Sequence, residues 1–446
     1  MKRVSAVISR GRHISSTSKR CLLLPSPCRT VLLQINRTQV RKMTTDPQED
    51  IAVSKFREYL RINTEQPNPD YYGCQKFLFA LADELGVQRA AYEPVAGKPF
   101  IVMTIEGSEP SLPSLMLYSH TDVVPTARDH WKYDPYSAHK DEKGDIYARG
   151  AQDMKCVGSQ YFEAIRRHFL RGKKQFRRTI HIVWGPDEEI GGKDGMAQFV
   201  KTPEFARLNV GYSLDEGLAV DGPVYVVYYG ERAPWWVRFT CEGNPGHGSK
   251  FIKNTAASKV HKLMSLALAY RDNQEALLTS NPSLTIGDVT SLNITVLKGG
   301  VQTNVIPENI TVEMDIRITP TDDFNAIEGM LQKWCKESGE GVRYEFTNRS
   351  MSKTTSKTTR DCPWWAAFED VMNEENIKFT KEIFTGATDS RFVRDLGISC
   401  LNFSPMANTP SLLHDHNEFL NEKVFLRGVE IYEKIIERMA DLPTAK

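Results

Sequence analysis

The apolar residues of this chain repeat at two spacings, one typical of helices and the other typical of strands. Short runs rich in β-branched and aromatic residues predict strands over 100–105, 115–122, 179–184, 208–214 and 398–403. Repeats at helical spacing predict helices over 51–61, 75–85, 155–170, 364–375 and 424–439. Because strands and helices alternate along most of the chain, we expect an α/β fold with a mostly parallel sheet.

The pattern changes between residues 230 and 352. In the segments 235–241 and 310–318 the apolar side chains fall at every second position, which is typical of an antiparallel sheet with one solvated face. The same stretch contains two predicted helices, over 255–270 and 324–336. We therefore expect an inserted α+β domain over 230–352, within a catalytic domain formed by 43–229 and 353–446.

Acidic residues gather where predicted strands end. The strand 179–184 opens into Gly-Pro-Asp-Glu-Glu-Ile-Gly-Gly, which places the carboxylates of Glu188 and Glu189 in a loop directly after it. Such a run is often only a solvated turn. However, the carboxyl ends of parallel strands meet at one rim of a sheet, where active sites are common. Two neighbouring acids can divide the work there, because one can bind a cation while the other moves a proton.

Two other strand-to-helix junctions carry similar candidates. The strand 115–122 ends in His120-Thr121-Asp122, and residues two apart in an extended chain face the same way. A carboxylate such as Asp122 can hold the second nitrogen of a metal-bound imidazole, although His120 alone could simply end a strand. Asp153 precedes the predicted helix 155–170, so it is either a helix N-cap or a carboxylate that bridges two cations.

Further candidates lie in polar loops later in the chain. Asp215 and Glu216 follow another predicted strand, His247 lies in a Gly-rich loop, and His414 and His416 lie among acids. Mixed nitrogen and oxygen ligands suit zinc. Two histidines and three carboxylates are too many for one tetrahedral ion but fit a pair of ions joined by a bridging carboxylate.

Composition limits the class of protein. The chain has 446 residues, of which 40% are apolar and 25% are charged, and it has no apolar run long enough to cross a membrane. Residues 1–42 hold ten Lys or Arg and no acid, so the remainder has 47 basic and 56 acidic residues, a net charge of −9. This acidic body argues against nucleic acid as a partner.

The basic stretch 1–42 is also rich in Ser and Thr, which is typical of a mitochondrial transit peptide. The alternative is translated upstream sequence without a role, since Met43 could be a second start. We expect a cytoplasmic protein, or a mitochondrial one if residues 1–42 act as a transit peptide.

Nine short segments of the chain resemble the M20 family of zinc peptidases and deacylases. In order, they are HTDVVP, GAQDMK, PDEEIGG, LDEG, NPGHGS, TNVIPE, MDIR, GATDSR and LLHDHNE, and the resemblance covers about residues 44–440. Each segment is weak evidence alone, whereas nine in the family order are specific. The extension 1–42 is not part of the usual family pattern.

The resemblance implies a zinc-hydrolase catalytic domain with two zinc ions per subunit. One ion would be bound by His120 and Glu216 and the other by Glu189 and His414, with Asp153 bridging both. Glu216 is chosen over the adjacent Asp215. His414 is chosen over His416 because the family pattern H-x-x-x-E pairs His414 with Glu418. Asp122 would orient His120, and Glu188 would be the general base.

The resemblance also implies that the inserted domain is a lid that dimerises. His247 would then reach the partner's active site and stabilise the oxyanion in trans. Arg317 and Asn304 would hold the substrate carboxylate, although most arginines placed like Arg317, beside acids on a polar strand face, are solvated ion-pair partners. The same pocket would be lined by Thr388, Asp389 and Arg391.

Together these implications describe a homodimeric amidohydrolase that converts an N-acyl-L-amino acid and water into a carboxylate and a free L-amino acid. A dipeptidase of the same family is an alternative, which would need an extra group to recognise a free amino terminus. A non-catalytic dimeric binding protein is a second alternative. It should have lost the general base or a ligand, and none of those positions is missing in this chain.

Overall fold

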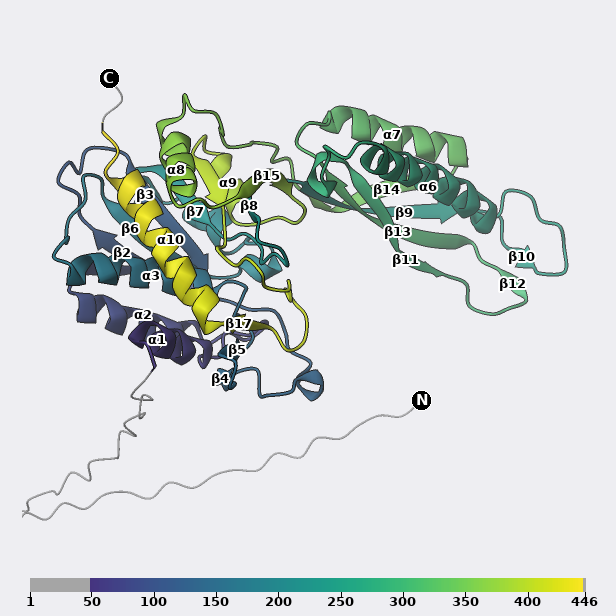
Figure 1. Ribbon diagram of the computed structural model, residues 1–446. Helices are drawn as coiled ribbons and strands as arrows, with labels where there is room; N and C mark the ends of the chain where they lie inside the picture. The colour runs from purple at the N-terminus through teal and green to yellow at the C-terminus, as the bar shows by residue number, and fades with distance from the viewer. Residues whose placement is uncertain (1–48, 444–446) are drawn as a thin grey trace, which may run out of the picture. The chain divides into compact units, whose positions relative to one another are not determined.

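A mixed eight-stranded sheet carries the strand ends on which the candidate residues lie. The computed structural model describes residues 49–443, and the expectations for residues 1–42 lie outside this range. The strand order is β1-β2-β6-β3-β7-β16-β8-β15. In that order the strands are Gln88–Val95, Lys98–Ile105, Ile180–Gly185, Ser114–His120, Val210–Asp215, Ser399–Asn402, Tyr225–Glu231 and Phe379–Phe384. Of these strands, Figure 1 labels β2, β6, β3, β7, β8 and β15.

The middle of this sheet is parallel, as expected. Strands β6, β3, β7 and β16 run parallel to one another, and β15 runs parallel to β8. The pairs β1–β2, β2–β6 and β16–β8 are antiparallel. The carboxyl ends of β6, β3 and β7 therefore lie side by side at one rim.

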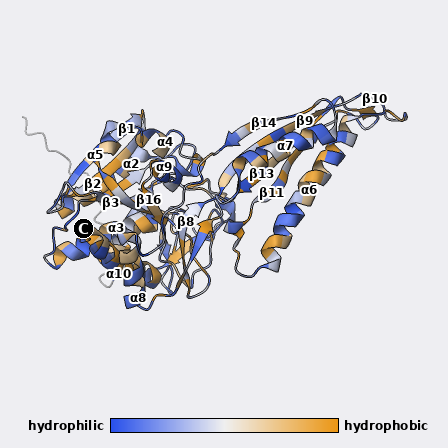
Figure 2. Cartoon of the chain, turned by 90° about the horizontal axis from the view of Figure 1, so that it is seen from above, coloured by the Kyte–Doolittle hydropathy of each residue, from blue (hydrophilic) through white to orange (hydrophobic). Residues whose placement is uncertain are grey.

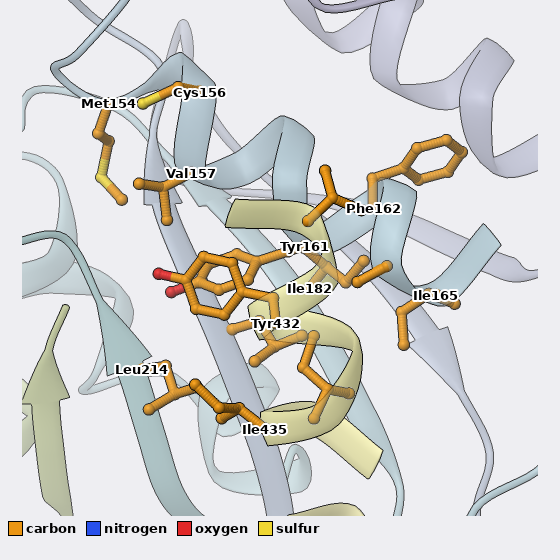
Figure 3. Packing of buried hydrophobic residues seen from close by; sticks show 14 of the residues in the cluster. Met154, Cys156, Val157, Tyr161, Phe162, Ile165, Ile182, Leu214, Tyr432 and Ile435 are labelled. Atoms are coloured by element: carbon orange, nitrogen blue, oxygen red, sulfur yellow. The ribbon is translucent and has the colours of Figure 1, made fainter. Parts of the chain in front are cut away.

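Both faces of the sheet are buried, each in its own apolar cluster. Successive side chains of a strand point to opposite faces, so neighbouring residues belong to different clusters. On β3, Leu115 and Leu117 belong to one apolar cluster, while Met116 and Tyr118 belong to another. Helices α3 (Lys155–Leu170) and α10 (Glu422–Ala440) pack on the first face, where the rings of Tyr161 and Tyr432 lie 4.6 Å apart (Figure 3). Burial of each large apolar side chain contributes about 1.5–3 kcal/mol to the free energy of unfolding. This packing holds the strands, and with them the strand ends, in place.

The remaining helices of this part complete its layers. The first cluster also includes residues of α1 (Ile51–Leu60), α2 (Tyr71–Leu85) and α8 (Pro363–Glu374), and the second includes residues of α4 (Met196–Phe199), α5 (Pro203–Arg207) and α9 (Ser390–Arg394). Of the described helices, none is long and apolar enough to span a membrane.

A separate four-stranded antiparallel sheet is formed by the stretch with alternating apolar residues. Its strand order is β11-β13-β9-β14, which is Ser291–Gly299, Asn309–Ile318, Ala233–Glu242 and Val342–Arg349. Trp235, Val237, Phe239 and Cys241 are buried against α6 (Ala256–Ser280) and α7 (Phe324–Ser338), so the expected one-sided burial is confirmed. Helix α6 carries hydrophobic and hydrophilic residues in turn (Figure 2).

The described residues also form two smaller sheets. Strands β4 (His139–Lys140), β5 (Asp145–Tyr147) and β17 (Phe419–Asn421) pair in the order β17-β5-β4, which brings the segment after His414 beside the segment before Asp153. Strands β10 (Gly246–His247) and β12 (Val305–Ile306) form a two-stranded ladder. Short 3-10 turns occupy Arg128–His130, Glu188–Ile190 and Ile286–Asp288.

Some element boundaries differ from those expected. Helix α6 continues to Ser280, ten residues beyond its predicted end. The stretch 271–280 includes good helix formers, which allows the helix to continue. It was missed because it faces solvent and lacks a clear apolar stripe. In the eight-stranded sheet, strands β1, β8 and β15 were not predicted. Two of them are the edges of the sheet, where exposure weakens the apolar pattern.

Candidate metal centre

Three neighbouring strands deliver candidate side chains to one rim of the eight-stranded sheet. His120 is the last residue of β3 and lies beside Gly185, the last residue of β6. Glu188 and Glu189 follow β6, and Glu216 follows β7. The order β6-β3-β7 therefore brings together residues that are nearly 100 positions apart in the sequence.

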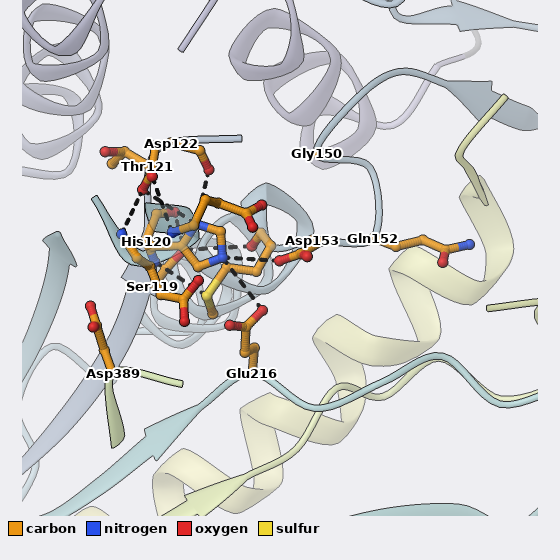
Figure 4. Close-up of polar contacts among 12 residues, drawn as sticks. Ser119, His120, Thr121, Asp122, Gly150, Gln152, Asp153, Glu216 and Asp389 are labelled. Carbon is orange, nitrogen blue, oxygen red and sulfur yellow. Dashed lines mark hydrogen bonds and ion pairs between the residues drawn. The ribbon is translucent and has the colours of Figure 1, made fainter. Parts of the chain in front are cut away.

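One group, which we call the His120 half, consists of His120, Asp153 and Glu216. His120 Nε2 lies 2.9 Å from Asp153 Oδ1 and 3.5 Å from Glu216 Oε2 (Figure 4). All three residues are buried. Asp153 is not a helix cap, because Met154 takes the N-cap position of α3 and no side chain caps that helix. The Asp153 carboxylate is instead directed at the histidines.

A second group, the His414 half, consists of Asp153, Glu189 and His414. His414 Nε2 lies 3.2 Å from Asp153 Oδ2 and 3.1 Å from Glu189 Oε2. Asp153 thus offers one oxygen to each half. In each group one ligand atom per residue lies within 4.8 Å of the others, a spacing that could hold a metal ion.

The pairs of neighbouring candidates are separated by the fold. Glu216 contacts His120, whereas Asp215 accepts hydrogen bonds from Ser390 Oγ at 2.6 Å and from the Glu216 amide at 2.7 Å. His414 contacts Asp153, whereas the His416 ring stacks on His130 with 4.8 Å between centroids.

Asp122 contacts His120 differently from what its spacing suggests. His120 Nδ1 is 2.9 Å from the backbone carbonyl of Asp122, while the Asp122 carboxylate is 3.7 Å from that nitrogen. The carboxylate instead accepts the amides of Glu188 at 3.1 Å and Glu189 at 3.2 Å. Asp122 therefore links the end of β3 to the loop after β6, and its carbonyl holds the imidazole.

The electrostatics of the site favour a bound cation. Burial alone would lower the pKa of His120, but Glu216 and Asp153 raise it well above its usual value. Burial and the nearby Asp153 raise the pKa of Glu189 to about 7 and also raise that of Glu216. Within residues 49–443, no Lys or Arg forms an ion pair with these three carboxylates.

The donor atoms also fit a metal pair. Glu189 Oε1 is buried and has no hydrogen-bond partner among the described residues, so it is an acceptor without a donor. Imidazole nitrogens with carboxylate oxygens are the donor set that zinc commonly takes in hydrolases. The residues of both halves therefore fit a two-ion centre with Asp153 between the ions.

Glu188 lies beside the centre but belongs to neither half. Its backbone is held by Asp122, and within residues 49–443 no hydrogen bond engages its carboxylate. Burial raises its pKa well above the usual value, while His120 opposes that rise. It lines a cavity of about 1010 Å³ that also reaches Asp153, Glu189 and His414. A carboxylate placed in this way can exchange a proton with a molecule in the cavity.

Three of the residues expected to bind substrate line the same cavity, namely Arg317, Thr388 and Arg391. Arg317 forms a bidentate ion pair with Asp315, with Nε 2.8 Å from Oδ1 and Nη2 3.0 Å from Oδ2. Asp389 does not line the cavity, because it is fully buried and its carboxylate accepts a hydrogen bond from Tyr118.

His247 and Asn304 lie together but not in the cavity of their own chain. The amide of Gly248 donates to the carbonyl of Asn304 at 2.8 Å, and His247 pairs with Val305 in the β10–β12 ladder. Both His247 and Asn304 are exposed. A single subunit therefore does not bring these two residues to the metal centre.

The structure adds residues that the sequence did not single out. Gln66 Nε2 donates to the Asp122 carboxylate at 2.8 Å, and the hydroxyl of Tyr71 donates to Asp187 at 2.6 Å. Trp236 and Arg349 line the cavity from β9 and β14. Trp236 could have been noticed, since it is a large aromatic at an outward position of an alternating strand.

Comparisons with known proteins identify the family of this chain. Residues 116–438 match the model of peptidase family M20/M25/M40. Mouse aminoacylase-1 is 50% identical over 402 residues, which cover 90% of this chain and 98% of the relative.

Solved structures with the same fold are more distant in sequence. An M20 family metallo-carboxypeptidase from Sulfolobus solfataricus superposes with a TM-score of 0.67 at 16% identity, over 88% of this chain and 100% of that chain. The YXEP protein of Bacillus subtilis, a dinuclear metal binding peptidase from the M20 family, gives a TM-score of 0.62 at 14% identity, over 87% and 96%. Because the family model matches most of the chain and mouse aminoacylase-1 is 50% identical to it, the chain belongs to peptidase family M20/M25/M40.

Proposed function

We propose that this protein is a two-zinc amidohydrolase that converts N-acyl-L-amino acids and water into a carboxylate and a free L-amino acid. The observation that carries the proposal is 50% identity to mouse aminoacylase-1 over nearly the full length of both chains. The two halves that share Asp153, with Glu188 beside them in the cavity, are consistent with it.

The protein would hold one ion with the His120 half and the other with the His414 half. Such a pair supplies Lewis acidity, which polarises a carbonyl and makes a bound water more acidic. Glu188 would accept the proton of the attacking water and deliver it to the leaving nitrogen. Asp122 would keep Glu188 and Glu189 in place through their backbone amides.

The substrate carboxylate would be held by Arg317. Its Nε and Nη2 groups form the edge of the guanidinium that suits a carboxylate, and both already contact Asp315. The substrate carboxylate would therefore compete with Asp315 or use the remaining N–H groups. The cavity also has apolar lining, including Ile190, Leu218 and Trp236, which suits aliphatic acyl groups and apolar side chains.

The alternative function is a dipeptidase of the same family. Apart from the acids at the metal centre, the cavity lining within the described residues includes one acid, Asp395, and four cations, Lys193, Arg317, Arg349 and Arg391. Asp395 already accepts a hydrogen bond from Ser352 at 2.8 Å. Arg317 and Arg349 are themselves paired with Asp315 and Glu328. Away from the metal centre, Asp395 is therefore the one lining acid among the described residues that could hold a protonated amino terminus, so we favour a neutral N-acyl group.

The test is release of free amino acid from N-acetyl-L-methionine, with the dipeptide Ala-Met beside it and metal content measured on the same sample. We expect preference for the acetylated substrate, loss of activity on chelation and recovery with zinc. Preference for Ala-Met would support the dipeptidase instead. A folded protein that binds no zinc would contradict both and favour a binding protein.

We further propose a homodimer in which His247 completes the active site of the partner subunit. His247 and Asn304 are exposed and do not line the cavity of their own chain, and the edge strand β11 exposes Val296 and Leu297. An unpaired, partly apolar edge is suited to pairing with a second copy.

Mixing two inactive variants tests the shared site. His247→Ala removes the oxyanion donor and Glu188→Gln removes the base, so a heterodimer has one active site with both groups intact. We expect the mixture to regain up to about a quarter of wild-type activity, from the statistics of random pairing and one intact site per heterodimer. If subunit exchange is verified and no activity returns, His247 does not act in trans.

A further inference from the structure

The two segments that carry Asp153 and His414 are joined by a buried polar cluster that the mechanism above does not use. The cluster is centred on Glu418, which is 0% exposed. Glu418 Oε1 accepts the amides of Gln152 at 2.6 Å and Asp153 at 3.2 Å. Its Oε2 accepts the amide of Gly150 at 3.1 Å and Arg149 Nη1 at 2.9 Å. Both oxygens of one carboxylate thus hold the backbone of the Asp153 loop.

Arg149 and Gln152 return contacts to the segment 410–419. Arg149 Nη1 also donates to the carbonyl of Asp415 at 3.0 Å, next to His414. The Gln152 side chain donates to the carbonyls of Pro410 and Phe419 and accepts the amide of Leu412. We call Glu418, Arg149 and Gln152 the clasp, because their side chains connect the two segments in both directions.

His414 needs such support. Its side chain is 53% exposed, and its φ of +60° lies in the left-handed region, which costs on the order of 1 kcal/mol for a residue with a side chain. Asn417, three residues later, also has a positive φ. The loop at His414 therefore has little packing of its own to keep the imidazole opposite Asp153.

We propose that Glu418 is a positioning residue for the candidate metal centre, acting with Arg149 and Gln152 to fix the distance between the Asp153 carboxylate and the His414 imidazole. The proposal rests on the proposed function, since it assumes that both residues bind metal. Glu418 does not line the cavity, so it touches neither substrate nor the reacting atoms. Its effect is expected to be larger on the His414 half, where both Asp153 and His414 lie on the segments that the clasp joins. In the His120 half, His120 ends β3 and Glu216 follows β7, and the clasp contacts neither residue.

Glu418→Gln tests this idea at nearly constant shape. Each carboxylate oxygen accepts two N–H donors, so an amide group placed on either side would face two donors and could not satisfy them. The loop must then shift. Because changes to groups that orient metal ligands typically cost 10–100-fold in affinity, we expect zinc at the weaker of the two sites to bind about 10–100-fold less tightly.

The measurement is a zinc titration of chelator-stripped protein against a chromophoric chelator, which resolves two binding steps. The matched control is Glu163→Gln on α3. Glu163 is also buried and also accepts hydrogen bonds from arginines, Arg166 and Arg167, but it does not contact either metal-centre segment. We expect Glu163→Gln to bind both ions like the wild type, even if both variants lose similar thermal stability.

The outcomes separate the two proposals. If the wild type binds two zinc ions and Glu418→Gln weakens both equally, or neither, the positioning role is wrong while the proposed function stands. If the folded wild type binds no zinc, the proposed function itself is wrong.

A pair of arginine variants covers the case in which Glu418→Gln does not fold. Arg149 makes its contacts with Glu418 and Asp415 through the single nitrogen Nη1, which a lysine ammonium can replace. Arg149→Lys should retain the second zinc ion with near wild-type affinity, whereas Arg149→Met should lose it. Equal zinc binding by the two variants would contradict the proposal.

Discussion

The two halves of the candidate metal centre share Asp153 but are built in different ways. His120 ends a buried strand and is itself fully buried, with its second nitrogen held by the carbonyl of Asp122. His414 lies in a loop, is half exposed and has a left-handed backbone. The first half is therefore preorganised by the sheet, whereas the second depends on side-chain contacts from Glu418 and its neighbours.

One fold can thus combine metal ligands that a packed sheet holds rigidly with metal ligands that a loop allows to adjust. Strand ends in a packed sheet cannot move without disturbing the apolar clusters on both faces. A loop can adjust its ligand or allow water to take the ligand's place. We expect the His120 half to dominate metal affinity, and the His414 half to be the one through which the centre exchanges metal.

The largest effect on turnover is expected from Glu188→Gln, which removes the base and leaves both halves intact. General acid–base groups typically contribute 10²–10⁴-fold, so we expect kcat to fall by roughly 10³-fold. Zinc content should stay at the wild-type level. The matched variant Glu189→Gln should lose metal as well. Loss of zinc from Glu188→Gln would mean that the roles of Glu188 and Glu189 are reversed.

The comparison between the halves is tested directly by His120→Asn and His414→Asn. Both variants should bind one ion more weakly than the wild type. His120→Asn should be the more severe by about tenfold in zinc affinity, since water can replace the exposed His414 more easily than the buried His120. Zinc titration of the two proteins side by side gives this ratio. A larger loss from His414→Asn would contradict our view of which half is preorganised.

The smallest effect concerns His181, which is buried like His120 but, among the described residues, has no carboxylates around it. Burial lowers the pKa of His181 from 6.5 to about 4, whereas the carboxylates raise that of His120. Between pH 6.5 and pH 4 the unfolded chain binds the proton more readily than the folded one. The free energy of unfolding should therefore fall as pH falls through this window, by about 2 kcal/mol at pH 5.

His181→Gln provides the control, because it keeps a donor for the carbonyl of Leu208 but cannot titrate. Denaturant unfolding at pH 7.5 and pH 5 should show a smaller loss of stability for this variant than for the wild type. The same loss in both proteins would show that His181 does not contribute. Activity at pH 7.5 should be unchanged, since His181 lies at the opposite end of β6 from Glu188.

The sequence predicted element types well where periodicity was strong. Helix α3 begins and ends where its apolar stripe does, and the alternation of 235–241 matches one-sided burial. The prediction was weakest for edge strands and for the end of α6, where exposure removes the apolar signal. The domain boundaries at 229/230 and 352/353 stay a prediction.

The chemistry of the site could be predicted from residue types at strand ends, but its geometry could not. Adjacent candidates such as Asp215 and Glu216 are equivalent by spacing, and only the direction of the chain after β7 turns Glu216 toward His120. The same is true of Asp122, whose carboxylate holds two backbone amides more closely than it approaches the imidazole.

From the residues alone follow the α/β class, the inserted antiparallel sheet and a histidine and carboxylate set suited to two zinc ions. Those features depend on local periodicity and on side-chain chemistry, which the order of residues contains. Only the tertiary structure shows that Asp153 faces both histidines, that Glu418 supports the His414 loop and that Asp389 is turned toward Tyr118. These contacts join segments up to 271 residues apart, so they depend on packing of the whole sheet.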